Sequence, residues 1–377
     1  MCKSYEKTSR TKSKAGDMKK LLWLFILILV ALCIIGGKSF FEQPLQPAID
    51  TIRVNNPSNS SNSSSSSTQE KIAVAVTTPQ VSRERLLTHI QKLNFQRYTN
   101  AERLRSRNYI TSELKKYGFQ PQQESFPEGM NIVAERLGSD KKAGAILIGA
   151  HYDTVLRSPG ADDNGTGVAV VLEIAKLFGS RTTPRTLKLA LFDQEETGLL
   201  GSRAFVAQKS HLKDLRGAII LDMLGFTCNN PGCQDYPTGL PIQPPSNKGD
   251  FIAVIGDTEH LPLLSSFQIN SFASAKANKT TNLPAVLTVP IPLKGIFTPD
   301  TLRSDHAPFW YQGIGAVLIT DTANLRNPHY HQPSDKPTNI DNNFFTGVAQ
   351  IIVNATEELL ESQNSLTTPI SNISSPS

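Results

Sequence analysis

Two short stretches of the chain hold residue types that could bind a metal ion. Residues 149–154 read Gly-Ala-His-Tyr-Asp-Thr, and residues 160–165 read Gly-Ala-Asp-Asp-Asn-Gly. Side chains alternate along a strand, so His151 and Asp153 should point the same way. A carboxylate so placed can hold one imidazole nitrogen and leave the other free for a metal. Because Asp163 follows in a glycine-rich loop, we predict that a metal site begins here.

Other candidate ligands follow other apolar runs. Glu195 and Glu196 come shortly after the run 186–192, and Asp222 comes directly after the run 217–221. His331 lies in the loop after the run 316–320. In an open α/β sheet, ligands bind beyond the carboxyl ends of the strands. If these runs are strands of one sheet, their following side chains converge on one edge.

The residue types in this set indicate which metal they would hold. Histidine and carboxylate ligands together favour zinc or a similar divalent ion. Five ligand positions are too many for one tetrahedral ion and suit two ions that share a carboxylate. The predicted ligands are His151, Asp163, Glu196, Asp222 and His331. His329 is a near alternative to His331, and the sequence alone leaves both open.

The elements that must position these side chains alternate along the chain. Apolar residues at helical spacing predict helices over 81–95, 100–117, 163–178, 261–272 and 342–360. Compact or alternating apolar runs predict strands over 131–134, 145–150, 186–192, 217–221, 251–255 and 316–320. This order predicts an α/β fold with a mixed, mostly parallel central sheet and helices on both faces. We expect a single catalytic domain over 79–363.

The N-terminal region has a different composition. The first twenty residues carry seven of the 38 Lys and Arg residues and two of the 33 acids, so the rest of the chain is neutral. A neutral body gives no electrostatic basis for nucleic-acid binding.

Residues 21–37 are apolar and barely long enough to span a bilayer. We expect a basic cytoplasmic tail over 1–20 and a membrane anchor over 21–37, with the body outside the cytoplasm.

Two alternatives to an anchor place the body in the same compartment. The segment 21–37 could be a cleaved signal peptide, although the residues at 36–38 form a poor cleavage site, or Cys33 could carry a lipid. Residues 38–78 are Ser-rich and predict a flexible linker, and 364–377 predict a disordered tail. In an oxidising compartment, Cys228 and Cys233 could form a local disulfide around a turn, or they could remain free thiols.

The chain resembles the two-zinc aminopeptidase family, whose members include glutaminyl cyclases and glutamate carboxypeptidases. The resemblance covers about 81–360 and rests on six motifs in order. They are His151-Tyr152-Asp153, the Gly-rich run 160–167, Glu195-Glu196-Thr197-Gly198-Leu199-Leu200-Gly201-Ser202, Leu221-Asp222-Met223, Ser304-Asp305-His306, and Tyr330-His331. Each motif alone is weak, but all six in this order are specific.

The resemblance implies a role for each site residue. His151 and Asp222 would hold one zinc ion, Glu196 and His331 would hold the other, and Asp163 would bridge them. Glu195 would act as general base, Asp153 would orient His151, and Tyr330 would stabilise the oxyanion. The resemblance also implies a cis peptide bond between Asp163 and Asn164. Asp305 and His306 would support the pocket.

These features predict a zinc-dependent exopeptidase, most simply an aminopeptidase acting on peptides. Two cations can lower the pKa of a water towards about 7, and Glu195 would take its proton. One alternative is a glutaminyl cyclase, a one-zinc acyltransferase of the same fold. Another is a tethered binding module that has lost catalysis. The oligomeric state and the preferred N-terminal residue are not predicted.

Overall fold

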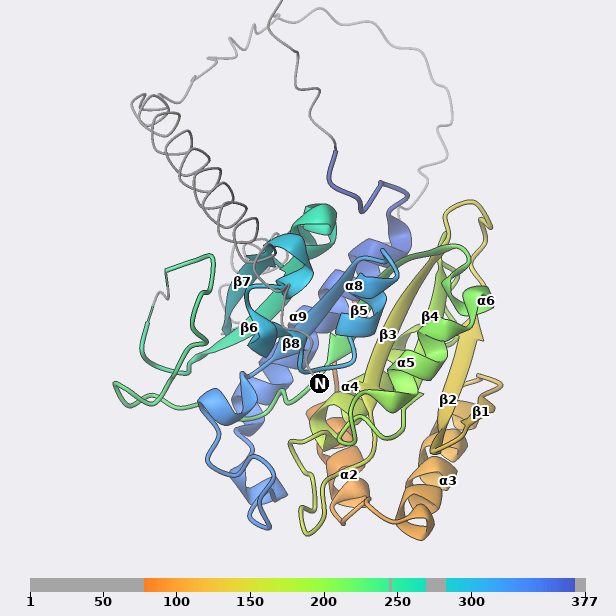
Figure 1. Cartoon of the computed structure of the whole chain (residues 1–377). Helices are drawn as coiled ribbons and strands as arrows, with labels where there is room; N and C mark the ends of the chain where they lie inside the picture. The colour runs from red at the N-terminus through yellow and green to blue at the C-terminus, as the bar shows by residue number, and fades with distance from the viewer. Residues whose placement is uncertain (1–77, 244–245, 269–282, 370–377) are drawn as a thin grey trace, which may run out of the picture. The chain divides into compact units, whose positions relative to one another are not determined.

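The strand that precedes the candidate histidine lies inside a mixed sheet. We describe a computed structural model of the chain, which covers residues 78–243, 246–268 and 283–369. In it, β3 (Ala145–His151) is buried along its whole length, as its apolar sequence predicts. The sheet has eight strands in the order β1-β2-β4-β3-β5-β8-β6-β7 (Figure 1).

The four strands around β3 explain how the candidate residues meet. β4 (Thr186–Phe192), β3, β5 (Leu215–Leu221) and β8 (Ala316–Thr320) are adjacent and parallel. Their carboxyl ends therefore share one edge, and the loops that follow them carry the candidate ligands. The predicted bounds of β4 and β8 are confirmed, and β5 begins two residues earlier than predicted.

The remaining strands make the sheet mixed. β1 (Gln122–Phe126) pairs with β2 (Gly129–Arg136), and β2 pairs with β4, both antiparallel. β6 (Phe251–Asp257) runs antiparallel to β8 and parallel to β7 (Ala285–Ile291). The mixed, mostly parallel sheet of the sequence prediction is confirmed.

Helices cover both faces of this sheet, as expected (Figure 1). One face packs against α2 (Arg83–Leu93), α3 (Asn100–Lys116), α4 (Gly165–Phe178) and α9 (Asn342–Glu361). The other packs against α5 (Leu200–Ala207) and α8 (Ala307–Tyr311), with α6 (Lys209–Leu212) beside α5. Alternate residues of β3 contribute to the two cores, Ile146 and Ile148 to the first and Leu147 to the second.

Short 3₁₀ helices occupy several connections. They are η1 (Thr258–His260), η2 (Pro292–Gly295), η3 (Pro299–Leu302), η4 (Ala323–Leu325) and η5 (Pro337–Asn339). The predicted helix 261–272 is helical through residue 268, and its remainder lies outside the described residues. Cys228 and Cys233 form a disulfide, which decides between the two states that the sequence left open.

Five helices and strands escaped the sequence prediction, among them the four-residue helix α6. β1 has a polar sequence with little burial, and β7 is a half-buried edge strand containing Pro290, so neither shows the expected alternation. α5 and α8 are short, and helical periodicity needs a longer window to be detected. Their positions are set by packing against the sheet.

The N-terminal predictions concern residues outside this description. The tail over 1–20, the membrane segment over 21–37 and nearly all of the linker over 38–78 lie there, as do residues 370–377 of the predicted C-terminal tail. Among the residues that are described, none of the helices has the length and apolar character needed to cross a bilayer.

Candidate metal centre

His151 occupies the last position of β3 and lies among carboxylates. Its Nδ1 is 3.5 Å from Asp153 Oδ1. Its Nε2 is 3.3 Å from Asp163 Oδ1 and 3.5 Å from Asp222 Oδ1. The ring is buried, with 1% of its surface exposed. Asp153 thus faces one imidazole nitrogen and leaves the other directed towards two further carboxylates.

Asp163 lies between two histidines. Its Oδ1 faces His151, and its Oδ2 is 3.2 Å from His331 Nε2. The same nitrogen of His331 lies 2.9 Å from Glu196 Oε2. Two sets of possible ligand atoms therefore share Asp163, each set within 4.8 Å: His151, Asp163 and Asp222, and Asp163, Glu196 and His331. His151, Glu195 and Glu196 form a third such group.

The loop before α4 fixes the position of Asp163. The peptide bond between Asp163 and Asn164 is cis, as the resemblance implied. Asn164 is the N-cap of α4, since its side chain accepts a hydrogen bond from Gly167 N, and it donates to Leu221 O. The helix begins at Gly165, so the predicted start at Asp163 is wrong by two residues. Asp163 is therefore free of any capping role.

Asp335 holds the same loop from the opposite side. Its two carboxylate oxygens accept hydrogen bonds from the backbone N–H groups of Asp162 at 2.8 Å and Asp163 at 3.0 Å. Asp162 is itself a support residue. It accepts hydrogen bonds from the backbone of Leu224 and Gly225 and from the Asn327 side chain.

Arg97 connects two parts of the segment between β3 and α4. Its guanidinium is fully buried and donates to the carbonyls of Tyr152, Pro159 and Gly160. Sequence analysis identified neither Arg97 nor Asp335, because each acts on backbone groups far away in the sequence. An arginine in a polar turn carries no pattern that predicts such a role.

Asp153 also organises the loop after β4. Its Oδ1 accepts a hydrogen bond from Glu195 N at 3.1 Å, and its Oδ2 accepts one from Glu196 N at 3.2 Å. α5 begins only at Leu200, so Glu195 and Glu196 lie in a loop and not in a helical turn. One carboxylate thus connects His151 to both glutamates.

The residues around Tyr330 complete the site. Tyr330 stacks on His331 with ring centroids 3.7 Å apart, and its hydroxyl accepts a hydrogen bond from Arg303. His329 bonds to Ser334 Oγ and packs against Phe226, away from the ligand groups. The His306 ring is fully buried and bonds to Thr301 O, in keeping with the predicted support role.

Burial and charge shift the pKa values of these groups. Burial raises the pKa of Glu195 well above its usual range and that of Glu196 to about 7. Partial burial opposes protonation of His331, but the carboxylates of Asp163 and Glu196 raise its pKa to about 10. The His331 imidazole is thus surrounded by carboxylates that favour positive charge at this position.

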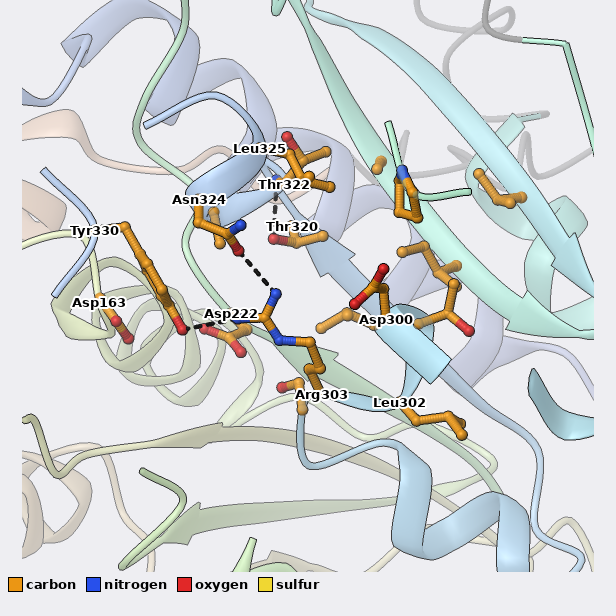
Figure 2. Close-up of a pocket in the computed structure, with 18 of the residues that line it drawn as sticks. Asp163, Asp222, Asp300, Leu302, Arg303, Thr320, Thr322, Asn324, Leu325 and Tyr330 are labelled. Carbon is orange, nitrogen blue, oxygen red and sulfur yellow. Dashed lines mark hydrogen bonds between the residues drawn. The ribbon is translucent and has the colours of Figure 1, made fainter. Parts of the chain in front are cut away.

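A cavity of about 450 Å³ opens at this edge of the sheet. His151, Asp163, Glu195, Glu196 and His331 line one part of it. Its other part is apolar and is lined from β6, β7 and β8 by Phe251, Ala253, Ile255, Leu287, Val289 and Leu318. Figure 2 shows Tyr330, Asp163 and Asp222 on one side of this pocket.

Comparison with protein families identifies the chain. The model of peptidase family M28 matches residues 131–243 and 265–356, which include every candidate ligand. The chain belongs to peptidase family M28. The fold, the order of the motifs and the edge at which the site lies agree with membership of the M28 family.

The chain is also similar to individual proteins. It is 29% identical to the uncharacterized protein YfbL of Escherichia coli over 84% of its own length and 92% of that protein. It is 26% identical to a probable leucine aminopeptidase of Arthroderma otae, over 62% of the chain but only 58% of that relative.

Solved structures show the same fold. The LapA aminopeptidase of Legionella pneumophila aligns with a TM-score of 0.58 and 20% identity, over 75% of this chain and 73% of that one. Glutaminyl cyclase of Porphyromonas gingivalis aligns with a TM-score of 0.54 and 20% identity, over 74% and 99%. Because a hydrolase and a cyclase both match, the fold alone does not distinguish these reactions.

Proposed function

We propose that this M28 peptidase is a zinc-dependent aminopeptidase that removes apolar residues from the N-termini of peptides. The observation that carries the proposal is the placement of Asp163 between two sets of ligand atoms. Its two oxygens face different histidines, and each histidine faces a further carboxylate. Such an arrangement suits two divalent ions that share one carboxylate.

Buried polar atoms without hydrogen-bond partners support the proposal that the site binds a metal. Glu196 Oε1 and His331 Nε2 are buried and have no hydrogen-bond partner among the described residues. The nitrogen lies 2.9 Å from Glu196 Oε2 but lacks the alignment of a hydrogen bond. Buried polar atoms without partners are costly, and a bound cation would satisfy both.

The proposal assigns each ligand. His151 and Asp222 would hold one zinc ion, Glu196 and His331 the other, and Asp163 both. Zinc bound there would lower the pKa of a water and polarise the scissile carbonyl. Asp153 Oδ1 lies 3.5 Å from His151 Nδ1, on the side of the ring opposite Nε2, so Nε2 is left for the metal position.

Glu195 and Tyr330 supply the proton transfer and the oxyanion contact. Glu195 is buried at the cavity wall, and its backbone is fixed by Asp153. Its raised pKa suits a group that accepts a proton from the attacking water and returns it to the leaving amine. The Tyr330 hydroxyl lines the same cavity and would donate to the developing oxyanion.

The cavity supports a preference for apolar N-terminal residues. Its apolar part belongs to the same cavity as the proposed metal ligands, and its aliphatic and aromatic lining suits an apolar side chain. Six carboxylates also line the cavity, and they would attract a free α-ammonium group: Asp163, Glu195, Glu196, Asp222, Asp235 and Asp300. The chemistry of the cavity and the names of the relatives agree on this substrate class.

Two alternatives are less well supported. A glutaminyl cyclase would need a single zinc ion, whereas two ligand sets are present here. A binding module without catalysis would have lost ligands or the general base, yet Glu195 and all five ligand positions meet at one edge. The alternatives differ in zinc stoichiometry and in turnover.

Substitution of Glu195 tests the mechanism. Glu195→Gln removes the proton acceptor without removing a ligand, so kcat on leucine p-nitroanilide should fall at least about 10³-fold while zinc content stays near two ions per chain. Zinc is measured by elemental analysis. Glu84→Gln, on the exposed first turn of α2, is the control and should keep full activity. A fully active Glu195→Gln enzyme, or turnover that persists in a chelator, would contradict the proposal.

We also propose that the protein is membrane-anchored with its catalytic domain outside the cytoplasm. The proposal rests on the basic and apolar segments before residue 38, and the Cys228–Cys233 disulfide supports an oxidising compartment. Carbonate washing should leave the protein with the membrane, and protease added to spheroplasts, from which any outer membrane has been removed, should remove the catalytic domain. Resistance of the domain until the spheroplasts are lysed would place it in the cytoplasm.

A further inference from the structure

Arg303 is a cation in a cavity of anions. It is the only Lys or Arg among the described residues that line the cavity, beside six carboxylates. It forms no ion pair with any described residue. An exposed arginine at the rim of an acidic site would normally pair with one of the neighbouring acids. Its positive charge is therefore available to a ligand.

Two neutral groups hold the guanidinium in place. One terminal nitrogen donates to Asn324 Oδ1 at 2.9 Å, and the other donates to Tyr330 Oη at 3.3 Å. Figure 2 shows Arg303 between these two side chains in the pocket. A guanidinium has five N–H donors, so three remain free. The side chain is oriented without being neutralised.

The backbone beneath Arg303 is fixed as well. It follows η3 (Pro299–Leu302) directly, and it precedes the fully buried Asp305 and His306. Thr301 on η3 accepts a hydrogen bond from His306 through its carbonyl. A guanidinium oriented by two acceptors on a rigid segment is well suited to bidentate binding of a carboxylate.

The position of Arg303 indicates which carboxylate it would bind. It contacts the hydroxyl of Tyr330, which our proposed mechanism places beside the scissile carbonyl. One extended residue covers about 3.3–3.6 Å, so the C-terminal carboxylate of a dipeptide lies one residue beyond that carbonyl. The apolar part of the cavity is suited to the N-terminal side chain instead.

We propose that Arg303 binds the free C-terminal carboxylate of the substrate and that the enzyme prefers dipeptides. This inference rests on the proposed aminopeptidase function and specifies its substrates. A longer peptide places a neutral amide where a dipeptide has its carboxylate, so it loses this charged contact. Asn324 and Tyr330 act as positioning residues for the guanidinium.

Paired substrates test the inference. Initial rates are measured on Leu-Leu, Leu-Leu amide and Asp-Leu amide with wild type, Arg303→Gln and Arg303→Lys. Wild type should favour Leu-Leu over its amide by at least about 10-fold in kcat/KM. Arg303→Gln should lower kcat/KM for Leu-Leu by about 10–100-fold, mainly through KM, and change the amide less than about 3-fold. Arg303→Lys should retain part of the preference.

A matched substitution and three outcomes make the test decisive. Arg216→Gln, at an exposed position near the start of β5, removes the same charge outside this cavity and should change neither substrate. Equal losses on Leu-Leu and its amide would overturn the inference, because Arg303 would then act only through Tyr330. Unchanged rates would overturn it too. A loss confined to Asp-Leu amide would show that the bound carboxylate is an N-terminal side chain, and would also overturn it.

A failure of the proposed aminopeptidase function can be distinguished from a failure of the Arg303 inference. If wild type hydrolyses none of these substrates and no p-nitroanilide, the aminopeptidase assignment fails. Calorimetry then tests Arg303 alone, with Leu-Leu and Leu-Leu amide titrated into wild type and Arg303→Gln. A preference of about 10-fold for the free carboxylate, lost in the variant, supports the carboxylate site. Equal binding of both ligands by wild type overturns it.

Discussion

Two neighbouring glutamates in the chain occupy different environments. Glu196 directs Oε2 at His331, whereas Glu195 faces the cavity and the side of His151. Both backbone N–H groups bind one carboxylate, that of Asp153. This shared anchor separates a proposed ligand from a proposed base by one residue, so a small shift of the loop would affect both.

At the residue scale, His306 can be used to test how burial of a histidine makes stability depend on pH. Burial lowers its pKa to about 4, against about 6.5 in an unfolded chain. Between pH 6.5 and 4 the unfolded chain binds a proton that the folded protein does not, so the free energy of unfolding should fall as the pH falls. At pH 5 this one group should cost about 2 kcal/mol relative to pH 7.

Urea unfolding at pH 7 and pH 5 measures this effect. Wild type and His306→Gln are compared, both in chelator, so that metal release does not contribute. At pH 7 the variant should have a lower free energy of unfolding than wild type, because the His306 ring is fully buried. Between pH 7 and pH 5, however, its free energy of unfolding should fall less than that of wild type. The same fall in both proteins would show that His306 titrates normally.

At the scale of elements, a loop and a strand end must be held together. Arg97 ties the end of β3 to residues 159–160, and Asp335 binds the backbone next to Asp163. These contacts come from parts of the chain far from the ligands they support. The metal site is therefore sensitive to residues that never touch the metal.

Asp335→Asn tests this support. Both carboxylate oxygens of Asp335 accept a backbone hydrogen bond, but the asparagine side chain has only one acceptor oxygen. Its NH₂ group would face the backbone N–H of Asp162 or Asp163, so one of the two hydrogen bonds would be lost. We expect zinc affinity to fall by about 10–100-fold, measured by competition with a chelating dye. Asp341→Asn is the matched control, because asparagine is as good an N-cap of α9 as aspartate. Equal affinity in both variants would exclude a role for Asp335 in the site.

The cap of α9 predicts a change in stability alone. Asp341 accepts hydrogen bonds from the backbone of Asn343 and Phe344 at 2.9 Å each. Asp341→Ala should lower the free energy of unfolding by about 1 kcal/mol, measured by urea denaturation. kcat/KM should not change, and a loss of activity would show that α9 influences the site.

At the scale of the whole molecule, the metal centre joins loops that follow four parallel strands. Without a cation, the carboxylates of Glu196 and Asp222 each lie close to the buried carboxylate of Asp163 and repel it. Metal that binds only the folded protein stabilises it by about 2.7 kcal/mol per site at a ligand concentration of one hundred times Kd. The folded state and the metal are thus thermodynamically linked.

Removal of the metal should therefore lower the melting temperature. For a domain of this size we expect a decrease of about 5–15 °C on dialysis against chelator, reversed by zinc but not by magnesium. Calorimetric or fluorescence melting measures the shift. The triple variant Asp163→Asn, Glu196→Gln and Asp222→Asn should melt at one temperature with and without zinc. A wild-type melting temperature indifferent to chelator would argue against metal binding.

The sequence by itself determined the parallel core and the ends of its strands. The apolar run before His151 could be located because burial on both faces excludes polar residues, and the run before Glu195 could be located because its apolar residues alternate. Together with the runs 217–221 and 316–320, they predicted that the proposed ligands meet at one edge, because parallel strands point the same way. Periodicity along the chain carries this information directly.

Only the tertiary structure decided how the site is held and which residues line the pocket. Arg97, Asp335 and Arg303 act through partners distant in the sequence, and β7 lines the apolar part of the cavity without a strand pattern of its own. Which distant residues contact each other depends on how the elements pack, and packing produces no repeating pattern in the sequence. The candidate residues of the site were therefore predictable, whereas the contacts that support them and the lining of the pocket were not.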